Sequence, residues 1–186
     1  PRSTLFPSTT LFRSASGFYA NHHLDGQMGF NNTAYRNGAD FNMLCSTNNS
    51  SSTNDVPGFD QVMKNNLGYN GRMEVANLNQ AASDVSYNFF TLPVTVASND
   101  FQSLDESLLT LPRQTNGDLP YISFAQLVSA SDLIDAGTNI DFPFAGAAPD
   151  LGAFEYGFPP PPGLALSRLG TQMIFSGGGG PAGGTN

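Results

Sequence analysis

The sequence predicts an all-β fold, a solenoid of stacked β-rungs in which each rung buries its apolar face against its neighbours. A short motif recurs three times, as residues 30–38 (FNNTAYRNG), 64–71 (KNNLGYNG) and, in a shorter copy, 84–88 (DVSYN). The tyrosines of these copies are 34 residues apart (35 to 69) and 18 residues apart (69 to 87), spacings that are typical of solenoid repeats. The composition agrees, because Asn, Ser, Thr and Gly favour turns and strands, and charged residues make up only 12% of the chain.

Alternation within the repeat places Thr33 and Tyr35 on one face of a strand and Ala34 on the other. Because an apolar residue and a tyrosine recur at the matching positions, we expect the tyrosine face to line the interior of the coil, where the three tyrosines stack. Residues 46–55 (STNNSSSTND) are interpreted as a mobile polar loop inserted between two rungs. Removing about 14 inserted residues from the longer interval leaves roughly 20, which is close to one β-helix turn.

A row of asparagines is a second pattern in the rungs. Asn21, Asn42 and Asn77 follow strands at comparable positions, so their side chains could hydrogen-bond along the axis of the coil. The abundance of asparagine in this chain explains the pattern equally well.

The N-terminal residues 1–14 (PRSTLFPSTTLFRS) differ from everything that follows. Residues 4–14 closely resemble the conceptual translation of a sequencing-adapter oligonucleotide, so we interpret residues 1–14 as non-native and exclude them from the predicted fold. The alternative is a short apolar N-terminal strand built on Leu5, Phe6, Leu11 and Phe12.

Residues 15–91 are predicted to form the β-helix rungs, and residues 92–157 the last strands and a loop-rich cap over the final rung. Within this cap we expect a strand at 92–96 and a short helix at 103–109, with Ser103 as its N-cap and Pro112 beyond its end. Residues 158–186 include a run of four prolines at 159–162 and a glycine-rich end, which predicts a disordered tail.

Charge and cysteine content exclude several functions. The net charge of -8 argues against nucleic acid or an anionic membrane as a partner, and no apolar run reaches the length of a membrane span. An acidic polysaccharide would also be repelled unless calcium bridges the carboxylates.

Cys45 is the only cysteine, so an internal disulfide is impossible. The chain begins at Pro1 without a methionine or signal peptide, so we expect that N-terminal sequence is missing.

Two sets of motifs carry a family resemblance. Residues 132–137 (DLIDAG) and 148–155 (APDLGAFE) resemble the closing signature of secreted right-handed parallel β-helix proteins, many of which act on polysaccharides. A larger set, spread over residues 15–157, resembles family 9 polysaccharide lyases, the pectate lyases with a single right-handed β-helix. This set consists of residues 17–23 (GFYANHH), 31–38 (NNTAYRNG), 65–69 (NNLGY), 74–77 (EVAN), 92–96 (LPVTV) and 112–120 (PRQTNGDLP).

The resemblance implies that this chain is the C-terminal part of a secreted, monomeric pectate lyase acting on an acidic plant polysaccharide. Such enzymes cleave by β-elimination, in which calcium neutralises the uronate carboxylate and an unprotonated lysine removes the adjacent ring proton. In the family, the calcium-binding aspartates and the lysine lie before the motif at 17–23. We therefore assign no catalytic or metal-binding residue here, and expect calcium in the parent enzyme, none bound to this fragment, and no activity of the fragment.

Two alternatives remain open. A non-catalytic β-helix module that binds carbohydrate or a surface would lack the upstream aspartates and lysine. A β-helix glycoside hydrolase would instead need paired upstream carboxylates.

The candidate substrate-binding residues are Asn21, His22, His23 and Arg36. Adjacent histidines in a strand point to opposite faces, so one could contact sugar, but the two cannot easily share a metal. Arg36 could pair with a uronate carboxylate, although an exposed arginine near a turn is an equal alternative. Lys64, the only lysine, is interpreted as a surface side chain.

Two pairs of acidic residues lie close together in the predicted cap. Asp132 and Asp135 are three residues apart, and Asp150 and Glu155 are five apart. On a capping loop we expect such residues to form turns and to accept hydrogen bonds from backbone amides.

Overall fold

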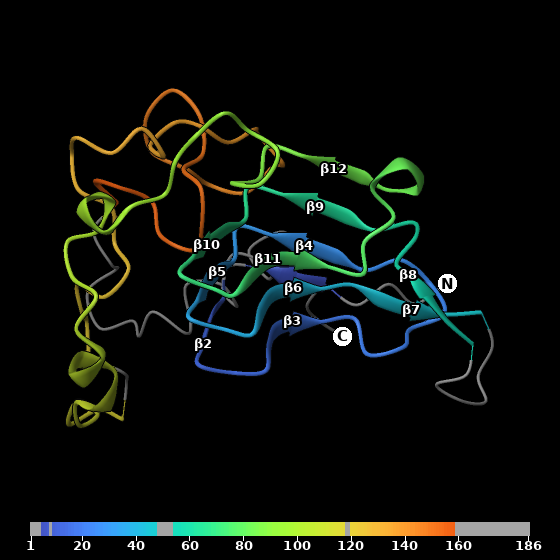
Figure 1. The fold of residues 1–186 in the computed structure, drawn as a ribbon. Helices are drawn as coiled ribbons and strands as arrows, with labels where there is room; N and C mark the ends of the chain where they lie inside the picture. Colours follow the sequence, from blue (N-terminus) through green and yellow to red (C-terminus); the bar gives the residue numbers. More distant parts are fainter. Residues whose placement is uncertain (1–4, 8, 48–53, 118–119, 159–186) are drawn as a thin grey trace, which may run out of the picture.

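The computed structural model describes residues 5–7, 9–47, 54–117 and 120–158, and for residues 5–7 it describes the backbone alone. The chain coils into a right-handed parallel β-helix with three sheets, as the sequence predicts (Figure 1). Sheet A contains β1 (Leu5–Pro7), β4 (Met28–Phe30), β9 (Val62–Lys64) and β12 (Asp84–Ser86). Sheet B contains β2 (Thr10–Phe12), β5 (Thr33–Tyr35) and β10 (Leu67–Tyr69). Sheet C contains β3 (Ser16–Tyr19), β6 (Ala39–Asn42) and β11 (Met73–Ala76).

Strand pairing gives the length of each rung. Leu5, Met28, Val62 and Asp84 lie side by side on sheet A, so successive rungs take 23 (5 to 28), 34 (28 to 62) and 22 (62 to 84) residues. The long rung carries an antiparallel hairpin of β7 (Leu44–Ser46) and β8 (Asp55–Pro57). The insertion that was expected between two rungs is therefore this hairpin, and residues 48–53 of its loop lie outside the described residues.

The tyrosine row is buried, but the prediction that it lines the interior of the coil is wrong. Tyr35 lies beside Tyr69 in register, and their rings stack with centroids 6.1 Å apart. Tyr35 also packs edge-on against Phe124, which belongs to the segment that follows the coil. Figure 1 shows this segment along the outer side of sheet B. The tyrosines therefore form the contact between sheet B and the cap.

The opposite face of sheet B lines the interior. A Cβ on Gly68, which lies beside Ala34, would sit 2.4 Å from the ring of Phe89. The same ring packs against Phe41 of sheet C, which in turn stacks on Phe18 of the rung before. Small residues in sheet B thus make room for aromatic rings in the coil.

The third copy of the repeat does not continue the tyrosine row. Residues Asp84–Ser86 pair with β9 of sheet A, so Tyr87 falls at the corner position held by Asn65 in the previous rung. Both residues have positive φ, 54° for Tyr87 and 58° for Asn65, and Tyr87 is 44% exposed. The prediction of three stacked tyrosines is wrong because the final copy is displaced to the corner.

A buried asparagine ladder, which the sequence pattern did not predict, follows the same corner. The side-chain amide of Asn32 donates to Asn66 Oδ1 at 2.9 Å, and that of Asn66 donates to Asn88 Oδ1 at 2.7 Å. All three side chains are fully buried. The predicted row is correct only for Asn42 and Asn77, whose side chains are 2.9 Å apart.

Asn21, the third member of the predicted row, is exposed at a corner after β3. It is out of register with Asn42, because Tyr19 lies beside Asn42 on the preceding rung, and Asn42 instead donates to Ser16 Oγ at 3.1 Å.

The segment after the coil is loop-rich, with its own buried residues Phe124, Leu127, Leu133 and Leu151. The predicted strand at 92–96 is wrong, because these residues form bends and extended chain without sheet partners. The predicted helix is a shorter 3-10 helix, η4 (Glu106–Thr110). Its N-cap is Asp105, whose side chain accepts from the Ser107 amide, so the assignment of Ser103 was wrong.

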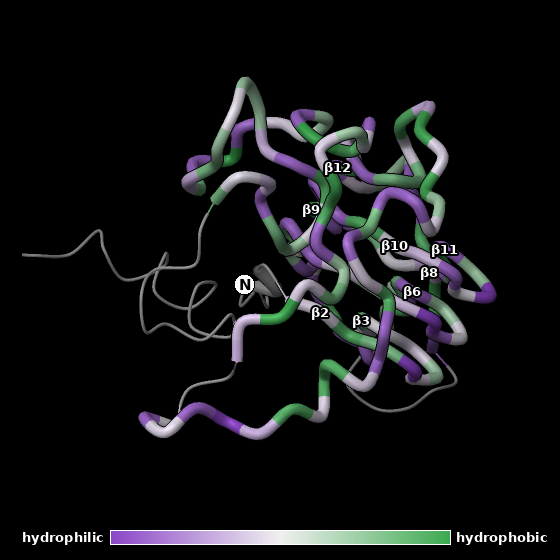
Figure 2. The backbone as a smooth tube through the Cα atoms, turned by 90° about the vertical axis from the view of Figure 1, so that its left-hand side faces the viewer, coloured by the Kyte–Doolittle hydropathy of each residue, from purple (hydrophilic) through white to green (hydrophobic). Residues whose placement is uncertain are grey.

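Two more short helices are η2 (Gln80–Ala82), at the corner before β12, and η3 (Ser98–Asp100), in the cap. Among the described residues, no helix is long and apolar enough to cross a membrane. Figure 2 shows hydrophobic and hydrophilic residues alternating along the chain.

The N-terminal segment supplies a rung. β1 pairs with β4 and β2 pairs with β5, both in parallel, which matches the alternative of short N-terminal strands. The origin of residues 1–14 stays a prediction, and so does the disordered tail, because residues 159–186 lie outside the described residues.

Candidate functional site

An arginine-lined groove follows the corner where sheet B passes into sheet C. Three links of equal length make this corner, residues 13–15, 36–38 and 70–72. They enclose a volume of about 510 Å³ lined by all of their members except Gly71. In an acidic chain, this groove carries three of the seven basic residues: Arg13, Arg36 and Arg72.

The backbone explains why these side chains line up. Phe12 and Tyr69 both lie beside Tyr35, so the residues that follow them, Arg13, Arg36 and Asn70, occupy equivalent positions in successive rungs. All three have a left-handed φ between 52° and 59°, which turns the chain sharply at the same point of each rung.

The side chain of Asn37 hydrogen-bonds the backbone of the preceding rung at this corner. It is buried, its Oδ1 accepts from the Ser14 amide at 3.0 Å, and its side-chain amide donates to the Leu11 carbonyl at 3.2 Å. Gly38 is required beside it, because a Cβ there would lie 2.4 Å from the Ala15 carbonyl oxygen. Buried backbone contacts thus fix the arginines at the surface.

A carboxylate of the cap pairs with two arginines of the groove. Glu106 Oε2 lies 2.7 Å from Arg13 Nη1, and Glu106 Oε1 lies 2.9 Å from Arg36 Nη1. The Arg36 guanidinium also lies 5.9 Å from the centre of the Tyr35 ring. Hydrogen bonding to Tyr35, and then to Glu106, raises the pKa of Arg36. Arg72 is exposed, and no carboxylate in the described part of the chain pairs with it.

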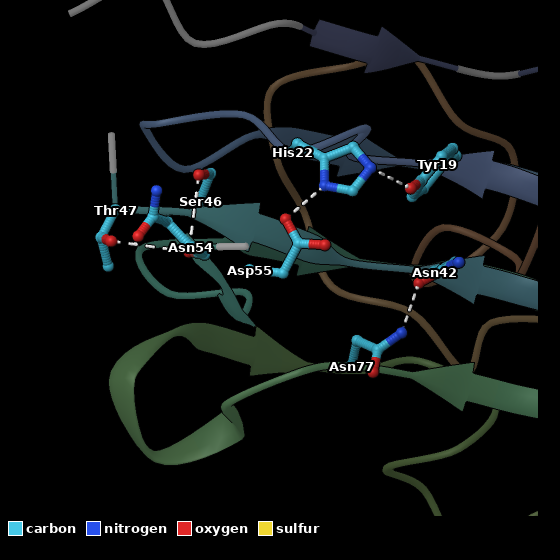
Figure 3. A network of polar contacts seen from close by, with 8 residues as sticks. All are labelled: Tyr19, His22, Asn42, Ser46, Thr47, Asn54, Asp55 and Asn77. Carbon is cyan, nitrogen blue, oxygen red and sulfur yellow. Dashed lines mark hydrogen bonds and ion pairs between the residues drawn. The ribbon is translucent and has the colours of Figure 1, made fainter. Parts of the chain in front are cut away.

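The predicted histidines lie at the other end of sheet C (Figure 3). His22 is held between the Tyr19 hydroxyl, 2.9 Å from Nε2, and Asp55 Oδ1, 2.5 Å from Nδ1. Asp55 belongs to β8, so this contact ties the inserted hairpin to the preceding rung. His23 Nδ1 lies 3.1 Å from the Asp25 carbonyl oxygen, so the two imidazoles have separate partners.

The structure therefore does not bring the four predicted site residues together. Asn21, His22 and His23 follow β3, whereas Arg36 precedes β6, at the opposite end of the sheet C strands. The sequence pattern that indicates the groove is an arginine directly after an aromatic residue, at Arg13 and Arg36. The groove was not predicted because Arg13 lies in the N-terminal segment that was excluded from the predicted fold.

The described residues do not fit a calcium site. No group of three or more His, Cys, Asp and Glu side chains within them is placed to hold a metal ion. Lys64, the only lysine of the sequence, forms an ion pair of 3.0 Å with Asp84 on the next rung, and its side chain is 23% exposed.

The cap carboxylates accept backbone amides, which confirms the prediction for three of them. Asp135 Oδ1 accepts from the amides of residues 147 and 148. Asp150 accepts from Asp135 N at 2.9 Å and Tyr156 N at 2.5 Å, and Glu155 accepts from Asp150 N at 3.1 Å. Burial, together with the negative charge of Asp150, raises the pKa of Glu155 to about 8.

The Glu155→Gln variant should be more stable than the original chain at alkaline pH, on the order of 3 kcal/mol. The folded protein keeps a proton on Glu155 that the unfolded chain loses near pH 4.5, so stability falls as pH rises toward about 8. Burial raises the pKa of Asp40 to about 6, which acts in the same direction, so the variant isolates the contribution of Glu155. Urea unfolding at several pH values measures the difference. The exposed Asp132→Asn substitution is the control, and equal pH profiles for all three proteins would contradict the assignment.

Sequence comparisons match this chain to pectate lyases. No family model matches the chain. The chain is 37% identical over 142 residues to pectate lyase L of Dickeya chrysanthemi, and 33% identical over 142 residues to pectate lyase L of Dickeya dadantii (strain 3937). Each alignment covers 76% of this chain, but the chain spans only 30% of the length of these relatives.

Two solved structures share the fold. The crystal structure of pectate lyase Pel9A matches with a TM-score of 0.65 and 29% identity, covering 82% of this chain and 36% of that protein. A rhamnogalacturonan lyase matches with a TM-score of 0.63 and 35% identity, covering 68% of this chain and 31% of that protein. The shared β-helix and the sequence identity together show that this chain, which aligns with about a third of the length of its relatives, belongs to the family 9 pectate lyases.

Proposed function

We propose that this chain is the C-terminal part of a secreted, monomeric enzyme that cleaves pectate by calcium-assisted β-elimination. The observation that carries this proposal is the 37% identity to a pectate lyase over 76% of the chain. The described residues hold no cluster that fits calcium, and the single lysine is paired with Asp84. We therefore derive no catalytic step from them, and propose that the catalytic residues lie outside this chain.

The described residues would support and bind the polysaccharide. Buried contacts hold the rungs in register, and each corner presents polar side chains at a fixed position. Arg36 at one end of sheet C, and Asn21, His22 and His23 at the other, are our proposed contacts to sugar. Since Tyr19 and Asp55 engage both ring nitrogens of His22, a hydrogen bond from His22 to sugar requires displacing one of these two groups.

The chain alone should not cleave pectate. The test incubates it with polygalacturonate and calcium and follows the ultraviolet absorbance of the unsaturated product, with an active pectate lyase as positive control. Circular dichroism on the same sample verifies that the chain is folded. We expect no product above background, and robust turnover would refute the proposal that the catalytic residues lie elsewhere.

A second candidate function is a non-catalytic carbohydrate-binding module. The arginine-lined groove favours it, because the groove presents guanidinium groups to solvent without a nearby base or metal cluster among the described residues. The two functions differ in the activity of the protein that contains this chain, and they share the binding of an acidic polysaccharide.

A further inference from the structure

Glu106 shows which chemical group fits the arginine-lined groove. Its two carboxylate oxygens pair with two different arginines, one from each of two neighbouring rungs. Carboxylate is a good partner for guanidinium, because its oxygens accept two charge-assisted hydrogen bonds at once. Two arginines of the groove therefore already bind one carboxylate, which the cap supplies from the first residue of η4.

This internal ion pair is open to exchange. The side chains of Arg13, Arg36 and Glu106 are 60%, 45% and 21% exposed. Ion pairs between exposed side chains contribute little to stability, since water and salt compete for both partners. A carboxylate from another molecule can therefore replace Glu106 at little cost.

The groove extends beyond the two arginines that Glu106 contacts. Strands of neighbouring rungs lie about 4.8 Å apart, so the equivalent positions of Arg13, Arg36 and Asn70 form a row along the axis of the coil. Arg72 adds an unpaired positive charge on the same rung as Asn70. A row of donors of this kind suits a linear ligand with repeated carboxylates better than a small anion.

We propose that the groove binds consecutive carboxylates of an acidic polysaccharide directly through Arg36 and Arg72, without a metal ion, and that Glu106 pairs with Arg36 when no ligand is bound. The polysaccharide class rests on the proposed function, whereas the carboxylate exchange rests on the groove alone. Arg13 adds to the groove in this chain, but the test uses only arginines outside residues 1–14.

The experiment titrates the chain with an oligogalacturonate in the presence of EDTA, by calorimetry at low salt. Glu106→Gln should tighten binding about twofold to fivefold, because it removes the competing charge. Arg72→Gln should weaken binding about tenfold, because it removes a charge-assisted contact. Arg36→Gln should act like Arg72→Gln, and if it fails to fold, the exposed Arg72 carries the test alone. Arg113→Gln is the matched control, since that side chain donates to the Gly117 carbonyl and is not part of the groove.

Two further ligands separate the possible outcomes. A fully methyl-esterified oligogalacturonate should not bind, because its carboxylates are masked. Equal binding of the ester, or no effect of the Glu106 and Arg72 substitutions, would overturn the proposal. Equal binding of a DNA oligomer, with the same response to the variants, would also overturn it, because the groove would then be a general polyanion site. Since EDTA prevents calcium-assisted cleavage, loss of groove binding is distinguishable from loss of lyase activity.

Discussion

Replacing Asn66 with alanine should destabilise the β-helix by about 3–5 kcal/mol, because it removes the middle of the buried ladder. Asn66 Oδ1 accepts from both the backbone and the side-chain amide of Asn32, at 3.2 and 2.9 Å. Its own amide donates to Asn88 Oδ1 and to the Gly29 carbonyl. Each buried group left without a partner costs roughly 1–3 kcal/mol, so the loss is a large share of a typical domain's stability.

Chemical unfolding monitored by circular dichroism measures this effect. Asn99→Ala is the control, because Asn99 is exposed, and it should change the free energy of unfolding by less than about 0.5 kcal/mol. If the two variants lost similar amounts of stability, the ladder would not be a main support of the coil.

Replacing Phe124 with alanine should cost about 3–5 kcal/mol and loosen the cap from sheet B. The ring is 1% exposed, and its centroid lies 5.3 Å from that of Tyr35 and 6.4 Å from that of Phe12. Removal of the ring leaves a cavity between the tyrosine row and the cap. The surrounding side chains lose their van der Waals contacts with the ring, which lowers the free energy of unfolding.

Limited proteolysis and urea unfolding together report this change. We expect faster cleavage within residues 92–157 and a lower unfolding midpoint. Leu111→Ala, at a side chain that is 45% exposed, provides the control for the loss of an apolar residue in the same segment. A Phe124→Ala protein with the original stability would show that the cap is not packed on the tyrosines.

Much of the β-helix could be predicted because matching residues of successive repeats lie beside each other in neighbouring strands. The motif that ends at Tyr35 and Tyr69 places these residues beside each other, as the structure confirms. The inserted polar loop could likewise be predicted from its composition, because it interrupts an otherwise constant rung length.

The side on which the tyrosines lie could not be predicted from alternation. Alternation shows that Thr33 and Tyr35 share a face, but both faces of sheet B are buried, one by the coil and one by the cap. The position of Tyr87 could not be predicted for another reason. Sequence does not distinguish a tyrosine with left-handed φ at a corner from a tyrosine in a strand.

The groove depends on contacts between distant parts of the chain. Arg13, Arg36 and Arg72 come from three rungs, and Glu106 comes from the cap, 70 residues beyond Arg36. Sequence alone identified Arg36 as a candidate, but its partners follow from the stacking of the rungs.

The central claim is that this chain belongs to an enzyme whose catalytic residues lie outside it. The most direct test measures calcium-dependent formation of unsaturated product from polygalacturonate by the protein that carries this chain together with the sequence preceding it in its gene. We predict turnover that EDTA abolishes and that this chain alone does not show. If the longer protein folds and binds polygalacturonate but forms no unsaturated product, the claim is contradicted and the chain is part of a carbohydrate-binding module.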